Sequence, residues 1–204
     1  MAAQRSKLRD VISLDSELNK LKDVDILLER ILTEARRVTS ADAGSIYIKR
    51  GDELVINYAQ NDTKQAELPK GEKLIYKVFS FPINKKSIAG YAAATGEPIN
   101  ISDVYKIPED SPYGFNKNVD KASGYLSKSM LVIPLRTNMG EILGVIQLIN
   151  KKTAKGNLTS FNKDDELVLM HFATNATVAL QRAQMTRAIL LRMIFFFNDT
   201  ATTE

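Results

Sequence analysis

One polar residue interrupts the most apolar stretch of the chain. Gln147 lies between Ile146 and Leu148, inside a run of apolar residues that ends at Ile149. A buried amide needs hydrogen-bond partners, so this side chain must meet protein, water or a ligand. The residues alone leave a structural and a ligand-binding interpretation open.

A second chemical feature is a capped helix start beside two cations. Ser87 is a good N-cap for a helix over Ile88 to Thr95, and Gly96 marks its end. The first turn of such a helix directs backbone N–H groups forward, and Lys85 and Lys86 precede it. This pattern suits a phosphate or carboxylate, but any capped surface helix has it too. An anion site and an ordinary helix start therefore remain alternatives.

Several kinds of chemistry are disfavoured by composition. The chain has no cysteine, which excludes a disulfide framework, a thiol nucleophile and a cysteine metal site. The one histidine, His171, falls among Met170, Phe172 and Ala173, which favours packing over a role as metal or haem ligand. We expect no metal, no cofactor and no catalytic residue.

Charge and hydropathy address partners and location. The 28 basic and 24 acidic residues give a net charge of +4, and the lysines are scattered, so we expect no nucleic-acid partner. No signal-peptide pattern is present, and no apolar run reaches the roughly 18 residues of a membrane span. We expect a cytoplasmic protein without a membrane partner.

The secondary-structure pattern predicts an α+β fold, an antiparallel sheet with helices on its faces and long helices at both ends. The centre is a buried hairpin of Met130 to Leu135 and Ile142 to Ile149, in which Pro134 indicates an edge or a bulge. Further strands are expected at residues 44–50, 53–60, 74–83 and 99–102, and a loop at 61–73. Helices are expected at residues 6–22, 26–38, 88–95, 115–122 and 164–194.

One motif with a fixed spacing is Asn150-Lys151, then Phe161, then Asp165-Glu166, and it is accompanied by the segments SIAGYAAATG, FNKNVDKASG and LGVIQLINK. On these residues the chain resembles a GAF domain, a GAF/PAS-like fold, from about Val24 to Arg182. The closer resemblance is to the cyclic-nucleotide-binding type of phosphodiesterases and adenylyl cyclases. The expected organisation is an amphipathic helix at 1–23 and a GAF domain at 24–182.

The resemblance also implies residue roles. Lys151 and Asp165 would pair and tie the last strand to the last helix. Ligand contacts would come from Ser45 and Gln60 to the base, from the backbone of Ile88, Ala89 and Asn116 to the phosphate, and from Ser123, Ser127 and Gln147 in the remaining wall. The family often has carboxylates near Gln60 and Gln147, so the two amides fix no base preference.

The C-terminal residues carry two further expectations. Residues 183–194 resemble a helical connector into an HD-GYP-type phosphodiesterase domain, which would be the missing output domain. Residues 195–204, FFFNDTATTE, resemble translated sequencing adapter and are expected to be foreign.

These features predict a regulatory domain that binds cAMP or cGMP, is not an enzyme, and dimerises through its terminal helices. The apolar residues of the expected interface are Leu180, Ala183, Ile189, Leu190, Leu191 and Met193. The alternative is a GAF module that binds no nucleotide and serves as a dimerisation spacer. An enclosed cavity shared by Ser45, Gln60 and Gln147 would favour binding.

Overall fold

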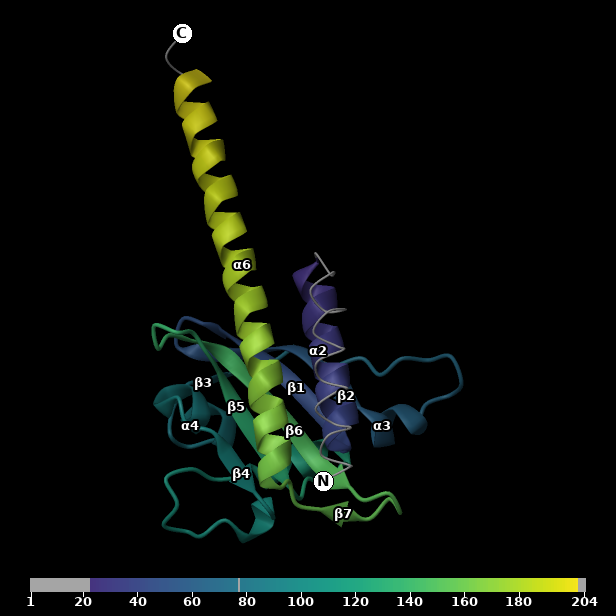
Figure 1. Cartoon of the computed structure of the whole chain (residues 1–204). Coiled ribbons are helices and arrows are strands. Elements are labelled where there is room, and N and C mark those ends of the chain that lie inside the picture. Colours follow the sequence, from purple (N-terminus) through teal and green to yellow (C-terminus); the bar gives the residue numbers. More distant parts are fainter. Residues whose placement is uncertain (1–22, 77, 202–204) are drawn as a thin grey trace.

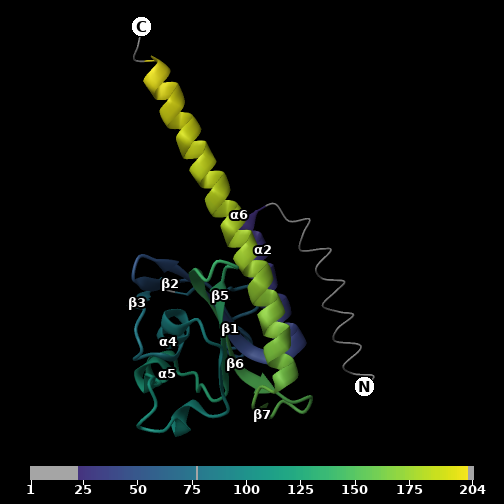
Figure 2. The same cartoon turned by 60° about the vertical axis from the view of Figure 1, so that its left-hand side comes forward.

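The computed structural model describes residues 23–76 and 78–201, with side chains described as far as Arg192. The helix expected at residues 6–22 lies outside this part of the chain. A seven-stranded antiparallel sheet forms the middle layer, with helices on both faces (Figures 1 and 2). The predicted α+β class is confirmed. The helices are α2 (Val24–Thr39), α3 (Asp62–Ala66), α4 (Ile88–Thr95), α5 (Lys117–Ser123) and α6 (Lys163–Ala201), with a 3-10 turn, η1 (Val104–Lys106).

The predicted central hairpin is present. It consists of β5 (Met130–Arg136) and β6 (Ile142–Lys152), and the strand order is β3-β2-β1-β6-β5-β4. Pro134 lies beyond the residues of β5 that pair with β4, near a register shift at Leu135, as its missing N–H predicts. The remaining strands are β1 (Ala41–Arg50), β2 (Glu53–Asn61), β3 (Ser80–Pro82), β4 (Ile99–Ile101) and β7 (Leu158–Thr159), which pairs with β6.

Each face of the sheet has its own hydrophobic core, because side chains alternate along the strands. Helices α2 and α6 cover one face, and α4 covers the other (Figure 2). The α2/α6 core includes Leu28, Ile31, Leu32, Ile46, Leu131, Ile146, Leu148 and Phe172. The α4 core includes Tyr47, Leu54, Ile88, Ala92, Val132 and Val145.

Two expectations for residues 61–83 are wrong. The loop expected at 61–73 contains α3, because the Asn61 side chain caps it by accepting from the Lys64 N–H. The strand expected at 74–83 is reduced to β3. The Gln65 amide bonds the Glu72 carbonyl at 2.7 Å and the Leu74 N–H at 3.0 Å, so a side chain takes the place of a neighbouring strand here.

The helix boundaries follow local capping. Ser87 caps α4 and Gly96, with φ +73°, ends it, as predicted. Asp23 is the N-cap of α2, and Asp25 in the first turn accepts from the Tyr58 hydroxyl. Helix α6 extends past the expected end at residue 194. No helix in the described part of the chain is long and apolar enough to cross a membrane, and no group of three metal-ligating side chains occurs there.

Candidate functional site

Two of the predicted ligand-facing residues lie side by side on the sheet. Ser45 of β1 pairs directly with Gln147 of β6, and both side chains face the α4 core in line with Tyr47 and Val145. Gln147 is only 7% exposed, yet its amide makes no hydrogen bond to any other residue that the structure describes. Among the described residues, the buried side-chain polar atom left without a partner is Arg36 Nε, so the Gln147 amide keeps some access to solvent and can bond to water or to a ligand.

Gln60 does not join this pair. It is paired with Gly44, one residue before Ser45, and neighbouring positions of a strand face opposite sides of the sheet. Its amide accepts from Arg36 at 2.9 Å and donates to Thr33 at 2.8 Å, both on α2. The expectation that Gln60 faces the same ligand as Ser45 and Gln147 therefore does not hold in this structure.

The start of α4 is covered by a neighbouring segment. The Ser87 hydroxyl accepts from the Gly90 N–H at 3.1 Å, and its carbonyl accepts from the Tyr91 N–H. Gly114 donates to the Lys86 carbonyl at 3.0 Å and forms a parallel bridge with Ser87. The segment around Gly114 thus lies beside the helix start where Ile88 and Ala89 were expected to receive a phosphate. Both of these residues are buried. The other helix start expected there, at α5, is capped by Asn116, which accepts from the Asn118 N–H.

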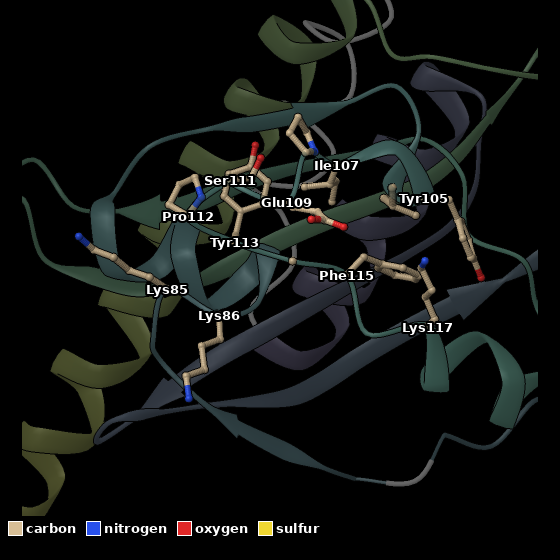
Figure 3. A pocket seen from close by; sticks show the side chains of 13 residues that line it. Lys85, Lys86, Tyr105, Ile107, Glu109, Ser111, Pro112, Tyr113, Phe115 and Lys117 are labelled. Carbon is tan, nitrogen blue, oxygen red and sulfur yellow. The ribbon is translucent and has the colours of Figure 1, made fainter.

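A cleft of about 430 Å³ opens next to this helix start (Figure 3). The buried Val104 is one of the residues that line it. Tyr105 and Phe115 form one wall, with ring centroids 5.6 Å apart, and the Lys117 ammonium lies 5.3 Å from the centre of the Tyr105 ring. Aromatic faces and a nearby cation suit the planar ring and charge of a small ligand.

The charges of the cleft are not compensated within the described part of the protein. Lys85 and Lys86 extend outward from the rim, while Glu109 lies nearer the centre (Figure 3). Together with Lys117 these give three positive charges and one negative, and none of the four forms an ion pair there. Lysine side chains are long and keep their ammonium groups in water, so these cations can reach an anion that enters the cleft.

The expected wall residues of the α5 region are tied into the protein itself. Ser127 donates to the Asp120 carboxylate from its N–H at 2.7 Å and from its hydroxyl at 2.8 Å. Ser123 is exposed, and its hydroxyl accepts from the Tyr125 N–H. Neither serine lines the cleft of Figure 3, and Ser127 has its partners within α5.

The motif residues hold elements together. The predicted ion pair between Lys151 and Asp165 is present, and Asp165 is fully buried. Asp165 and Asn162 also cap the start of α6 reciprocally, through two N–H to side-chain hydrogen bonds of 2.9 and 3.0 Å. Phe161 is buried in the α2/α6 core, and Glu166 pairs with Lys163.

Asn150, at the end of β6, has a left-handed backbone with φ +59°. The side-chain oxygen Oδ1 of Asn150 accepts from the Lys128 N–H at 2.6 Å. The side-chain nitrogen Nδ2 donates to the Leu126 carbonyl and to the Tyr125 hydroxyl. This residue therefore fastens the segment between α5 and β5 to the end of β6.

Asp42 is a buried junction that the sequence did not reveal. Its carboxylate accepts from Lys152, from Thr63 at 2.7 Å and from the Tyr125 hydroxyl at 2.7 Å. Burial works to raise the pKa of Asp42, but these hydrogen bonds outweigh it and leave the pKa below its usual value. Its partners are distant in sequence, and the residue itself precedes the expected start of the first strand, so periodicity could not identify it.

His171, on α6, is partly buried and contacts Asn175 and the ring of Phe172. These neighbours agree with a packing role.

Comparison with known proteins decides the family. The family model described as GAF domain matches residues 23–180. The chain belongs to the GAF domain family. The GAF domain is a regulatory domain that binds small molecules.

Among curated proteins, the chain is similar to "Dual 3',5'-cyclic-AMP and -GMP phosphodiesterase 11A" of Takifugu rubripes, with 40% identity over 100 residues. That alignment covers 49% of the chain and 10% of the relative, so the chain matches about a tenth of that protein's length.

Solved GAF structures share the fold at low sequence identity. The GAF domain of a Coxiella burnetii phosphoenolpyruvate-protein phosphotransferase has a TM-score of 0.68 and 18% identity, covering 91% of this chain and 98% of that chain. A free methionine-R-sulfoxide reductase from Neisseria meningitidis has a TM-score of 0.62 and 19% identity, covering 86% and 89%. At these identities the similarity shows the fold alone.

Proposed function

We propose that this GAF domain binds a cyclic nucleotide on the α4 side of its sheet and regulates an output domain joined to α6. The observation that carries the proposal is the cleft beside α4, with its aromatic wall and three lysines. Gln147 and Ser45 do not line this cleft but lie opposite each other on the same face of the sheet, where the Gln147 amide makes no hydrogen bond to the described residues. An amide can both donate to and accept from a purine edge. The similarity to a protein named for cyclic AMP and cyclic GMP supports this ligand class.

The test is a calorimetric titration of the protein with cAMP and cGMP. We expect binding at micromolar concentrations and a stabilisation of about 2.7 kcal/mol when the nucleotide is at 100 times its Kd. A Gln147→Leu variant should lose at least about tenfold in affinity, because it removes the amide and leaves the ligand's polar edge unpaired.

Gln60 offers a matched control, since it carries the same side chain on the opposite face of the same sheet. Gln60→Leu should leave nucleotide affinity unchanged. Titrations without heat or stabilisation for both nucleotides, on folded protein, would favour the alternative of a non-binding dimerisation spacer. The apolar packing between α4 and the sheet is the feature that speaks for this alternative.

The proposed output domain is of the HD-GYP type, on the resemblance of residues 183–194 to its connector. Sequencing of the full-length gene from independent DNA tests this proposal and the expectation that residues 195–204 are foreign. A reading frame that continues past residue 194 into a different domain would contradict the HD-GYP assignment.

A further inference from the structure

The short segment between α5 and β5 is fastened at two points by buried polar groups. The first is Asp120, which accepts from Ser127 and from the Tyr105 hydroxyl at 2.9 Å, and Tyr105 forms part of the cleft wall. The second is Asn150, which bonds Leu126 and Lys128, the two neighbours of Ser127, as described above. The segment therefore connects the cleft to the end of the central strand.

Tyr125 lies near the start of this segment, directly after the C-cap Gly124 of α5, and reaches a third point. Its hydroxyl donates to the Asp42 carboxylate at 2.7 Å and accepts from the Asn150 amide at 3.0 Å. The bond to Asp42 is the one hydrogen bond between this segment and Asp42 in the described structure.

Asp42 in turn joins the elements that lead to the terminal helices. Its carboxylate binds Lys152 of β6, and its carbonyl accepts from Arg36 of α2 at 2.8 Å. Lys151, adjacent to Lys152, pairs with Asp165 at the start of α6. A displacement of the Tyr125 hydroxyl thus acts on groups that position both α2 and α6.

We infer that the Tyr125 hydroxyl is a latch that couples the position of the α5–β5 segment to helices α2 and α6. This inference concerns regulation and rests on the proposed function only for the identity of the ligand. The latch has two states, hydroxyl bound to Asp42 or released, and a ligand can shift them only if it binds one state more tightly. The hydroxyl takes part in two hydrogen bonds of a part-buried network, so its loss weakens the junction while the tyrosine ring keeps its packing surface.

The experiment is amide hydrogen exchange, followed by NMR, on the 204-residue chain carrying Tyr125→Phe. Three hydrogen-bonded N–H groups serve as reporters. The Lys128 N–H reports on the segment, the Lys152 N–H on the end of β6, and the Glu166 N–H on the start of α6. All three should exchange faster by at least about threefold, the factor that corresponds to one net hydrogen bond. Faster exchange at Lys128 alone would overturn the inference, because the latch would then hold only its own segment.

Two controls separate coupling from general destabilisation. Tyr113→Phe makes the same chemical change on the cleft wall, where the ring packs against Tyr91, and should leave all three amides unchanged. Ile146→Val weakens the α2/α6 core, so it should speed exchange in the core strands without the selective effect on Lys128 and Lys152. An identical pattern in Ile146→Val and Tyr125→Phe would show that the latch variant acts only by lowering global stability, which also overturns the inference.

The ligand arm uses cAMP and cGMP at 1 mM as probes. A change in Glu166 exchange on nucleotide addition should be present in the wild type and absent in Tyr125→Phe; a change retained in the variant overturns the inference. If neither nucleotide binds, the proposed function fails, and the ligand-free comparison alone still decides whether the latch couples the elements.

A Tyr125→Phe variant that does not fold would be replaced by a double-mutant cycle of Asp42→Asn with Lys151→Met. Additive effects on the free energy of unfolding in that cycle would overturn the coupling.

Discussion

Asp165 stabilises the junction between β6 and α6 through two different kinds of interaction. Its carboxylate pairs with Lys151 on the strand and accepts from the Asn162 N–H, while the negative charge favours the helix N-terminus. Because Asp165 is fully buried, removing its cation leaves a charge without its main compensation.

The Lys151→Met variant should therefore destabilise the domain by about 3 kcal/mol, a value typical of breaking a buried ion pair from one side. Asp165→Asn should cost a similar amount, and the double variant should cost less than the sum of the two. The measurement is urea unfolding of the four proteins in a double-mutant cycle. Simple additivity would contradict a direct interaction between the two side chains.

Tyr125 gives a prediction for alkaline pH. Burial, and then the hydrogen bond and charge of Asp42, raise the pKa of Tyr125 well above the usual 10. A raised folded-state pKa stabilises the protein below the unfolded pKa, and this contribution is lost as pH rises from about 10 toward the folded value. The wild type should therefore lose up to about 1.4 kcal/mol more than Tyr125→Phe between pH 9 and pH 11. Urea unfolding at both pH values measures the difference, and parallel pH profiles would contradict it.

The contacts of single residues were predicted well where a local motif determined them. They were predicted poorly where they depended on the register in which two strands pair. The Lys151–Asp165 ion pair followed from a motif whose parts lie at a strand end and a helix start. The role of Gln147 was left open, and in the structure the residue is 7% exposed with an amide that keeps some access to solvent, so both interpretations still stand. Gln60 was placed on the wrong face, because a register of one residue in the β1–β2 pairing decides its side and no local signal fixes that register.

At the scale of elements, β1 and β6 approach each other unusually closely at one glycine. A Cβ on Gly144 would lie 2.1 Å from the Tyr47 carbonyl oxygen, beside the bulge between Ile46 and Tyr47. No side chain fits there without moving the backbone of a central strand. The glycine therefore sets the spacing of the two strands that carry Ser45 and Gln147.

We expect Gly144→Ala to destabilise the domain by about 3 kcal/mol or more, the upper part of the range for overpacking. Gly114→Ala is the control, because its added Cβ would meet only the Lys86 carbonyl at an ordinary 3.7 Å. Thermal unfolding should show a large drop in Tm for the first variant and a small change for the second. Equal effects would mean that the strand spacing tolerates a side chain.

Helices with capping signals were predicted almost to the residue, as for α4 between Ser87 and Gly96. Residues 61–83 were not, because Gln65 and Asn61 satisfy backbone groups there through side chains. The pattern of apolar residues alone predicts a strand in such a segment. The pattern does not show that side chains of neighbouring residues will bond to the backbone in place of a partner strand.

At the scale of the whole molecule, α6 extends far beyond the sheet that its first half covers (Figures 1 and 2). Its 39 residues correspond to about 58 Å. Leu180 is only 9% exposed and belongs to the α2/α6 core, so its assignment to a partner interface was wrong. The exposed apolar side chains lie farther along, at Met185, Ile189, Leu190 and Leu191, while the side chain of Met193 is outside the described part.

This outer surface is where we expect a second copy of the chain to pair with α6 in a parallel dimer. Met185 and Ile189 are 68% and 60% exposed and are four residues apart, so they share one face of the helix. Met185→Glu combined with Ile189→Glu should convert dimers to monomers at tens of micromolar, measured by sedimentation velocity. Thr186→Glu, beside them on the same helix, controls for added charge. The unmutated protein sedimenting as a monomer at these concentrations would contradict self-pairing. The apolar end of α6 would then have to be covered by the proposed output domain.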